Sequence, residues 1–271
     1  MILIKKELKK SLKKIQSKFI KTTVLNETVI DNLPYRVVDK TSFLPWYKNR
    51  RALCFKNPDE PHRIYVHSMI YHSKRSHYQP TLIIPQKVIE AWHNVYKVKN
   101  ALMLGAAGCT VPRFIALNFP EMTTVGIEYC PEFIELANKY FFISEISDRF
   151  SLVQGDAYDY VKNPNVSSKS DVVFVDIFSE YSIPNETFSD EFINALYEIT
   201  SSDAVIIFNL LSLNQDDAVV FAKGIKASFS RKTVICKNER VTLVLVKSTD
   251  SEKSKRFSDR LHTLGDITEI I

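Results

Sequence analysis

Residues 101–114, ALMLGAAGCTVPRF, join a predicted strand to a predicted helix through a turn with two glycines. The strand is Ala101–Leu104, the turn is Gly105–Gly108, and the helix is expected over residues 111–118. Glycine lets a backbone approach a ligand closely, and a helix N-terminus favours negative or electron-rich groups. Gly105 and Gly108 are therefore candidate cofactor contacts, although tight strand-to-helix turns also use glycine for steric reasons alone.

The alternation of strand and helix continues beyond this turn. Strands are predicted at residues 124–127, 150–153, 171–176 and 204–208, with helices over 131–142, 157–162 and 188–200. Repeated strand–helix–strand units imply a parallel sheet with right-handed crossovers. After a helix over 215–229, strands 233–236 and 240–246 have so short a link that they must form a hairpin. The pattern predicts an α/β fold, a Rossmann-like seven-stranded sheet of the S-adenosylmethionine-dependent transferase type.

Two further segments precede this domain, which we expect over residues 81–271. Residues 22–80 contain short β-rich runs separated by turns with Pro and Asn, which predict a small β-rich N-terminal subdomain. Residues 1–21 place apolar side chains at helical spacing among lysines, which predicts a basic amphipathic helix. That helix docks either on its own domain or on a second subunit of a homodimer. The alternative is weak peripheral contact with an anionic membrane, or with RNA.

Charge and composition exclude several functions. Of the net charge of +5, residues 1–21 carry +7 through eight lysines and one glutamate, so the rest of the chain carries −2. A nucleic-acid-binding protein needs its basic stripe on the folded body, so we expect no nucleic-acid partner. No stretch approaches the roughly 18 apolar residues of a membrane span, and lysines interrupt every short apolar run near residue 1. We therefore expect a cytoplasmic protein without a transmembrane segment.

The cysteines and histidines do not predict a metal site. The four cysteines include no CxxC pair and no metal-ligand spacing, as expected for reduced thiols. Four histidines recur every five residues, a spacing that alternates between the faces of a strand and prevents convergence on one ion. They are His62, His67, His72 and His77.

Three acids stand at the ends of consecutive predicted strands. Glu128 follows Gly108 by 20 residues, which suits an acid that accepts hydrogen bonds from both ribose hydroxyls of an adenosine. Asp156, in Gly155-Asp-Ala157, can accept from the exocyclic amine of adenine. Asp176 closes an apolar strand, where loss of water raises a carboxyl pKa and suits it to proton transfer. Because open α/β sheets bind ligands at the carboxyl ends of their strands, we expect these acids to share one site.

These motifs resemble the polyamine aminopropyltransferases, the spermidine synthase family of polyamine biosynthesis. The resemblance lies in Gly105–Arg113, Glu128, Gly155–Ala157, Val175-Asp176 and the run His77-Tyr78-Gln79, within about residues 30–247. It implies that Gln79, Glu128, Asp156 and Ala157 hold the adenosine part of S-adenosylmethionine or its decarboxylated form. It also implies that Tyr78 and Asp176 face a small-molecule amine acceptor, with Asp176 as proton acceptor and no metal.

The chain departs from the family pattern at two positions. Gly108 stands where the family carries an Asp that grips the aminopropyl amine, and Ser179 replaces a second Asp, with Glu180 beside it. Three readings therefore remain open. The first is an aminopropyltransferase-like enzyme, and the second is an S-adenosylmethionine-dependent methyltransferase, which needs no grip on a second amine. The third is a catalytically silent nucleoside-binding protein, against which the retained acids argue.

Overall fold

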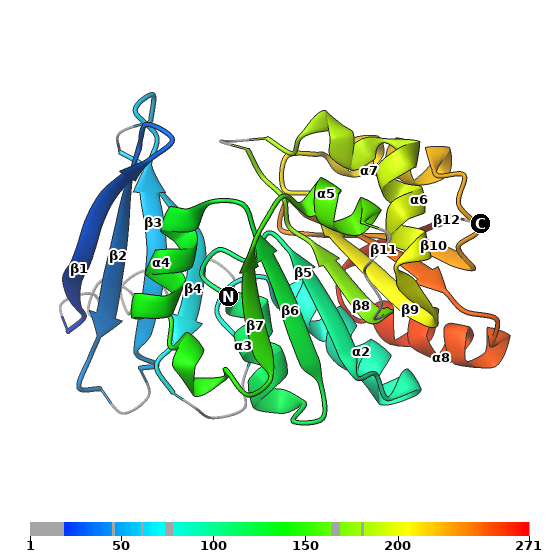
Figure 1. Cartoon of the computed structure of the whole chain (residues 1–271), viewed down its shortest axis with the longest axis horizontal. Helices are drawn as coiled ribbons and strands as arrows, with labels where there is room; N and C mark the ends of the chain where they lie inside the picture. Colours follow the sequence, from blue (N-terminus) through cyan, green and yellow to red (C-terminus); the bar gives the residue numbers. More distant parts are fainter. Residues whose placement is uncertain are drawn as a thin grey trace, which may run out of the picture. The chain divides into compact units, whose positions relative to one another are not determined.

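The computed structural model describes residues 19–44, 47–60, 62–73, 78–163, 169–179 and 182–270 (Figure 1). The chain divides into two compact units. The small unit ends at Arg75 and takes in Gln79–Thr81, and the large unit holds Ser76–Tyr78 and Leu82–Ile271. The helix predicted over residues 1–21 lies outside the described residues, except at its end. There Lys21 is already in a strand and pairs with Thr41, so the helix prediction is wrong for this residue.

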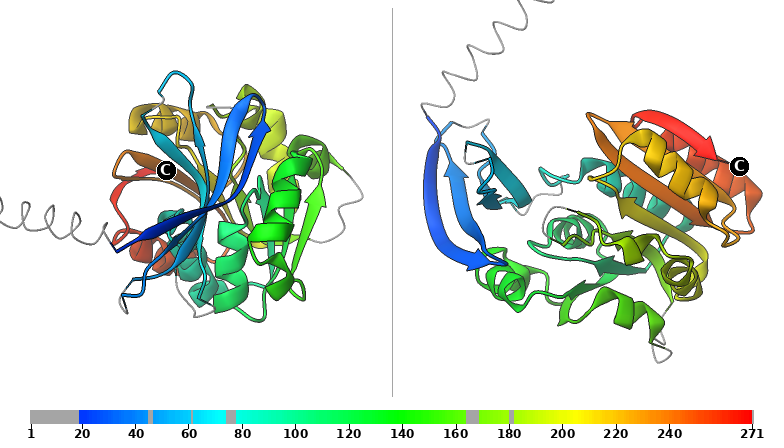
Figure 2. Two further views of the ribbon diagram at one scale, coloured as in Figure 1. Left: turned by 90° about the vertical axis from the view of Figure 1, so that its left-hand side faces the viewer. Right: turned by 90° about the horizontal axis from the view of Figure 1, so that it is seen from above.

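The small unit is a four-stranded antiparallel sheet in the order β1-β2-β3-β4, which confirms the predicted N-terminal sheet. Its strands are β1 (Lys21–Ile30), β2 (Leu33–Thr41), β3 (Arg50–Lys56) and β4 (Ile64–Tyr71). Asp31 and Asn32 alone separate β1 from β2, and both are left-handed, with φ of 50° and 62°. Two-residue hairpins need this backbone, and Asn and Asp tolerate it well. Figure 2 shows the long curved ribbon that β1 and β2 form.

The large unit contains the predicted mostly parallel sheet, in the order β12-β10-β11-β9-β8-β5-β6-β7. Its parallel strands are β5 (Asn100–Leu104), β6 (Thr123–Glu128), β7 (Phe150–Gln154), β8 (Ser170–Val175) and β9 (Thr200–Asn209). The predicted hairpin is β10 (Arg231–Lys237) and β11 (Arg240–Lys247), and β11 pairs antiparallel with β9. Because β8 lies between β5 and β9, the strand order reverses at β5 and β8, where such sheets bind ligands.

An eighth strand extends the seven that the sequence predicts. Helix α8 (Ser251–Leu261) leads into β12 (Asp266–Ile270), which pairs antiparallel with β10 at the edge of the sheet (Figure 2). The sequence pattern misses both because α8 is mostly charged and β12 is only five residues long. Two buried apolar residues, Phe257 and Leu261, hold α8 on the core, and the Phe257 ring meets Trp92 edge-on at 4.9 Å.

Helices cover both faces of the large sheet (Figure 1). On one face, α2 (Ile83–Tyr96), α3 (Thr110–Asn118) and α8 pack on a core that includes Ala101 and Met103. On the other face, α5 (Ala157–Lys162), α6 (Asp190–Glu198) and α7 (Gln215–Gly224) pack on Leu102 and Leu104. The remaining helical segments are α4 (Pro131–Tyr140), η1 (Ile143–Glu145) and η2 (Asn185–Phe188). With both faces covered, the carboxyl edge of the strands is left as the place for a ligand. Among the described residues, no helix is long and apolar enough to cross a bilayer.

Candidate active site

Gly105 lets the ends of two neighbouring strands approach closely. It follows β5 with φ of +83°, and a Cβ there would lie 2.2 Å from the carbonyl oxygen of Asp176. The backbone N–H of Asp176 also donates to the carbonyl of Leu104, the residue before Gly105, at 2.8 Å. The left-handed backbone and the close contact both require glycine, so Gly105 has a structural reason independent of any ligand. This glycine brings the candidate base against the turn after β5.

The turn after Gly105 is strained. Ala107 and Cys109 have φ of 36° and 55°, and Cys109 is the residue before α3. A residue other than glycine in this region costs about 1–2 kcal/mol. Gly108 is buried, and its φ is not positive, so Gly105 is the one glycine among the three left-handed residues Gly105, Ala107 and Cys109. Such strain persists only when neighbouring groups hold it.

Glu128 is the group that holds this turn. Its Oε2 accepts from the N–H groups of Ala106 at 3.1 Å and Ala107 at 2.7 Å. Its Oε1 accepts from the Cys130 N–H at 3.0 Å. The side chain is buried at the end of β6, 7% exposed. A carboxylate has about four acceptor positions, so these three bonds leave room for a further donor such as a ribose hydroxyl.

Asp156 and Ala157 stand at the start of α5, next to the end of β6. Asp156 is the N-cap, and its Oδ1 accepts from the N–H groups of Tyr158 at 2.7 Å and Asp159 at 3.1 Å. Ala157, the first helical residue, is buried. The Gly155 N–H donates to the Glu128 carbonyl at 3.0 Å, which ties the two strand ends together. The cap explains an Asp here without a ligand, but both bonds use one oxygen of the carboxylate.

Asp176 lies just beyond β8 and is partly buried. Burial raises the pKa of its carboxyl, a hydrogen bond from Asn209 lowers it, and the nearby Glu128 charge raises it, so that together they bring the pKa from 3.8 to about 6. That bond joins Asn209 Nδ2 to Asp176 Oδ1 at 2.6 Å. A carboxylate with this pKa is ionised at neutral pH and basic enough to receive a proton, as a general base requires.

Tyr78 contacts groups on two helices of the large unit. Its ring stacks on Phe114 of α3, with centroids 5.4 Å apart, and its hydroxyl donates to the Glu90 carboxylate of α2. Burial, together with the Glu90 contact, raises the pKa of the Tyr78 hydroxyl well above its usual value. The hydroxyl therefore stays protonated, with its proton directed at Glu90. Its oxygen can still accept a hydrogen bond from an ammonium group.

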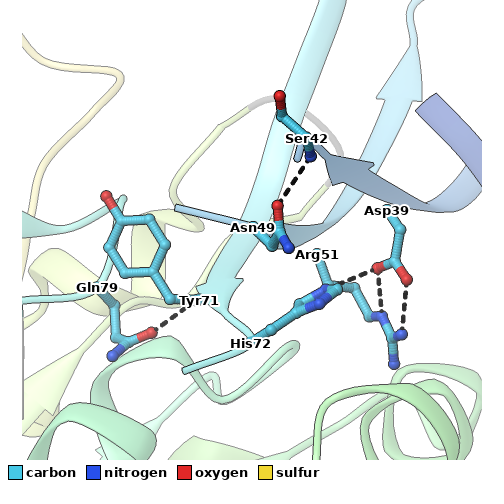
Figure 3. A network of polar contacts seen from close by, with 7 residues as sticks. All are labelled: Asp39, Ser42, Asn49, Arg51, Tyr71, His72 and Gln79. Atoms are coloured by element: carbon cyan, nitrogen blue, oxygen red, sulfur yellow. Dashed lines mark hydrogen bonds and ion pairs between the residues drawn. The ribbon is translucent and has the colours of Figure 1, made fainter. Parts of the chain in front are cut away.

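Gln79 belongs to the small unit, where it contacts Tyr71 beside a group of polar contacts around Asp39 (Figure 3). Its Oε1 accepts from the Tyr71 N–H at 3.0 Å, and the residue is fully buried. His72, the residue after Tyr71, contacts the Asp39 carboxylate at 3.0 Å. Arg51 binds the same carboxylate through two nitrogens, Nε at 2.7 Å and Nη2 at 2.9 Å. Burial raises the pKa of Asp39, but Arg51 and His72 outweigh it and lower that pKa overall.

The comparison with known families decides the identity of this arrangement. Residues 65–242, about two thirds of the chain, match the family model of the spermine/spermidine synthase domain. The chain belongs to the spermine/spermidine synthase family. The match covers β4, the strained turn and the three acids, so the features on which the predicted resemblance rested lie inside it.

Two curated relatives of this synthase-family chain carry different activities in their names. A polyamine aminopropyltransferase of Chromobacterium violaceum is 28% identical over 111 residues, 41% of this chain and 42% of that protein. An eEF1A lysine and N-terminal methyltransferase of Mus musculus is 29% identical over 138 residues, 47% of this chain and 19% of that protein. The matched part thus spans about two fifths of the first relative and about one fifth of the second.

A solved structure agrees with the family at the level of the fold. A probable spermidine synthase from Corynebacterium glutamicum superposes with a TM-score of 0.63 and 14% identity, over 91% of this chain and 88% of that one. The α/β architecture with a small antiparallel sheet ahead of it is therefore the synthase fold. Both curated relatives are named as transferases.

Two residues of this synthase-family site were missed by sequence reasoning. Asn209 is the last residue of β9, just as Asp176 is the first residue after β8. A search for polar residues at the carboxyl ends of the strands finds Asn209 when it includes amides as well as acids. Glu90 lies inside α2 with no local signal and is found only through Tyr78. Ser179 pairs with Ser182 in a tight turn, and the residues between them, Glu180 and Tyr181, lie outside the described chain. In the part of the chain that is described, no group of His, Cys, Asp and Glu is arranged to hold a metal ion.

Proposed function

We propose that this chain transfers an aminopropyl group from decarboxylated S-adenosylmethionine to an amine acceptor, with Asp176 as the proton acceptor. The observation that carries the proposal is the carboxylate of Asp176, partly buried at the end of β8 with a pKa of about 6. It lies against the Gly105 turn, beside the charge of Glu128. A nucleoside held at that turn would present its sulfonium side to this carboxylate.

The chemistry asks little of the protein beyond alignment and one proton transfer. The amine lone pair attacks the methylene carbon next to the sulfonium, a carbon–nitrogen bond forms, and the carbon–sulfur bond breaks. Its electron pair stays on sulfur, which leaves a neutral methylthioadenosine. The new ammonium then gives one proton to the Asp176 carboxylate. Alignment of the reacting atoms and a positioned base are each established sources of rate, the base typically about 10²- to 10⁴-fold.

The adenosine is proposed to bind along the carboxyl edge of the large sheet. Glu128 would accept from a ribose hydroxyl with the acceptor position that its three backbone bonds leave. Asp156 would accept from the adenine amine with the oxygen that its helix cap does not use, next to the small Ala157. Gly105 and Gly108 would form the floor of the site, and the role of Gln79 in holding adenosine stays a prediction.

Methyl transfer from S-adenosylmethionine is the second candidate, and Gly108 favours it. The aminopropyl tail of the decarboxylated donor ends in an ammonium, which needs an anionic partner once water is excluded. Glycine at this position cannot supply one. The partial match to a protein named as a lysine and N-terminal methyltransferase points the same way. In both reactions an amine attacks an activated carbon, so Asp176 could serve either.

The two reactions are separated by the mass of the product. The purified chain is incubated with each donor and a panel of mono-, di- and polyamines, and Asp176→Asn serves as the matched inactive variant. We expect the decarboxylated donor to add one aminopropyl unit to at least one amine, and the variant to add none. A methyl adduct formed only from S-adenosylmethionine would replace the proposal with the second candidate. No adduct from either donor, with methylthioadenosine still bound, would identify a silent nucleoside-binding protein.

A further inference from the structure

Asn209 donates a hydrogen bond to the carboxylate of the proposed base. We propose that Asn209 is the positioning residue of Asp176: its amide fixes one carboxylate oxygen and directs the other toward the acceptor amine. The role of Asp176 as base rests on the proposed function, whereas the contact itself is a feature of the fold. The hydrogen bond from Nδ2 to Oδ1, at 2.6 Å, is short for a nitrogen donor, as charge-assisted bonds are.

The strands place Asn209 beside Asp176 and hold it there. Val175 pairs with Phe208 across β8 and β9, so the next residue of each strand is Asp176 on one side and Asn209 on the other. Asn209 also pairs with Thr242 of β11. Asn209 is only 6% exposed. The backbone N–H of the next residue, Leu210, donates to the Val241 carbonyl at 2.9 Å. The amide is therefore presented from a strand that is bonded on both sides.

Asp176 is held from the opposite side through its backbone. Its N–H donates to the Leu104 carbonyl at 2.8 Å, and its own carbonyl lies against Gly105, where a Cβ would come within 2.2 Å. With the backbone held by β5 and one oxygen held by β9, the direction of the second oxygen is fixed. Pre-organised groups of this kind act without reorganisation during the reaction.

An amide suits this position better than a charged group. Burial raises the pKa of Asp176, the hydrogen bond from Asn209 lowers it, and the Glu128 charge raises it. A lysine in place of Asn209 would form an ion pair and remove the basicity that proton transfer needs. An acid would compete for the same proton. A neutral donor anchors the carboxylate and leaves its basicity near the value at which general bases work best.

The test compares Asn209→Ala and Asn209→Asp with Ser201→Ala. Ser201 lies at the other end of β9 and donates to Asp171 at 2.9 Å, so its loss removes a side-chain hydrogen bond from the same strand, away from the carboxyl edge. Carboxyl carbons are labelled with carbon-13 in aspartate and titrated by NMR, and Asp176→Asn identifies the resonance. We expect the Asp176 pKa to rise by about one unit in Asn209→Ala, because a hydrogen bond to the charged form is lost. In Asn209→Asp the rise is larger, because two adjacent carboxyls share a proton.

The titration decides the inference whether or not the proposed reaction is correct, because it needs no substrate. Where turnover is measurable, the acid limb of the kcat profile should move by the same amount in Asn209→Ala, with the donor KM unchanged. Ser201→Ala should leave both the titration and the acid limb in place. An Asp176 pKa unchanged in a folded Asn209→Ala protein would overturn the inference. So would an equal shift in Ser201→Ala, since that would indicate a general loosening of β9.

Discussion

The carboxylate of Glu128 accepts a 2.7 Å hydrogen bond from the backbone N–H of Ala107, a residue whose φ of 36° lies in the left-handed region. The side chain predicted to bind ribose is thus also the one that holds the strained turn after β5. A charge-assisted bond of this kind contributes about 1.5–3 kcal/mol, enough to offset the cost of one left-handed residue. The proposed ribose contact and the observed turn geometry therefore involve the same carboxylate.

Glu128→Gln should weaken both nucleoside binding and the hydrogen bonds that hold the turn after β5. Its amide NH₂ would face either the N–H donors of the turn or the ribose hydroxyls, so one set of bonds is lost. We expect affinity for methylthioadenosine, measured by calorimetry, to fall about tenfold or more. Stability should fall by about 1–3 kcal/mol for the unmatched donors. Glu135→Gln removes the same charge from an exposed position of α4 and should change neither. Unchanged affinity in Glu128→Gln would contradict the ribose assignment.

Gly105→Ala should destabilise the large unit. The added Cβ would lie 2.2 Å from the Asp176 carbonyl oxygen at a backbone φ of +83°, so overpacking and a left-handed alanine add together. We expect a loss of about 2–4 kcal/mol in the free energy of unfolding, measured with urea. Gly224→Ala is the matched control, because a Cβ at the end of α7 meets nothing within 4 Å. It should be neutral or slightly stabilising. Equal effects of the two changes would contradict the close contact.

Asp176→Asn should raise the free energy of unfolding at neutral and alkaline pH but not at acidic pH. The folded pKa of about 6 lies above the ordinary value of 3.8, so the folded chain binds more protons than the unfolded chain between these values. Stability of the wild type therefore falls as pH rises from about 4 to 6. Asn keeps an oxygen for Asn209 without the charge, so we expect a gain of about 1–2 kcal/mol at pH 7.5 and none at pH 4. Thermal melts at both values measure this, and a gain at pH 4 alone would contradict the raised pKa.

The parts of the fold and site that sequence predicts are those with a local signal. Parallel strands buried on both faces are continuous apolar runs, and their carboxyl ends lie at one edge, which is enough to place Glu128, Asp156 and Asp176 along that edge. The hairpin of β10 and β11 follows from a two-residue link. By contrast, α8 and β12 are held by contacts far apart in sequence, such as that of Phe257 with Trp92.

The second roles of the site residues are also beyond sequence reasoning. That Glu128 holds Ala107, and that Tyr78 donates to Glu90, depends on side-chain directions fixed only when the helices pack on the sheet. A sequence pattern indicates which residue types reach an edge of the sheet. It does not indicate which of their oxygens are already engaged there.

Tyr78→Phe and Glu90→Gln should weaken acceptor binding more than they slow the chemical step. The Tyr78 hydroxyl donates to the Glu90 carboxylate, which makes its oxygen a better acceptor for the ammonium end of an amine. We expect the amine KM to rise about tenfold in Tyr78→Phe and about threefold in Glu90→Gln, with kcat changed less and the acid limb of the pH profile unmoved. Tyr197→Phe is the control for loss of a tyrosine hydroxyl, because the Tyr197 ring contacts the Lys247 ammonium and not Glu90. If kcat fell while the amine KM stayed constant, Tyr78 would act in proton transfer, and its raised hydroxyl pKa would need a different explanation.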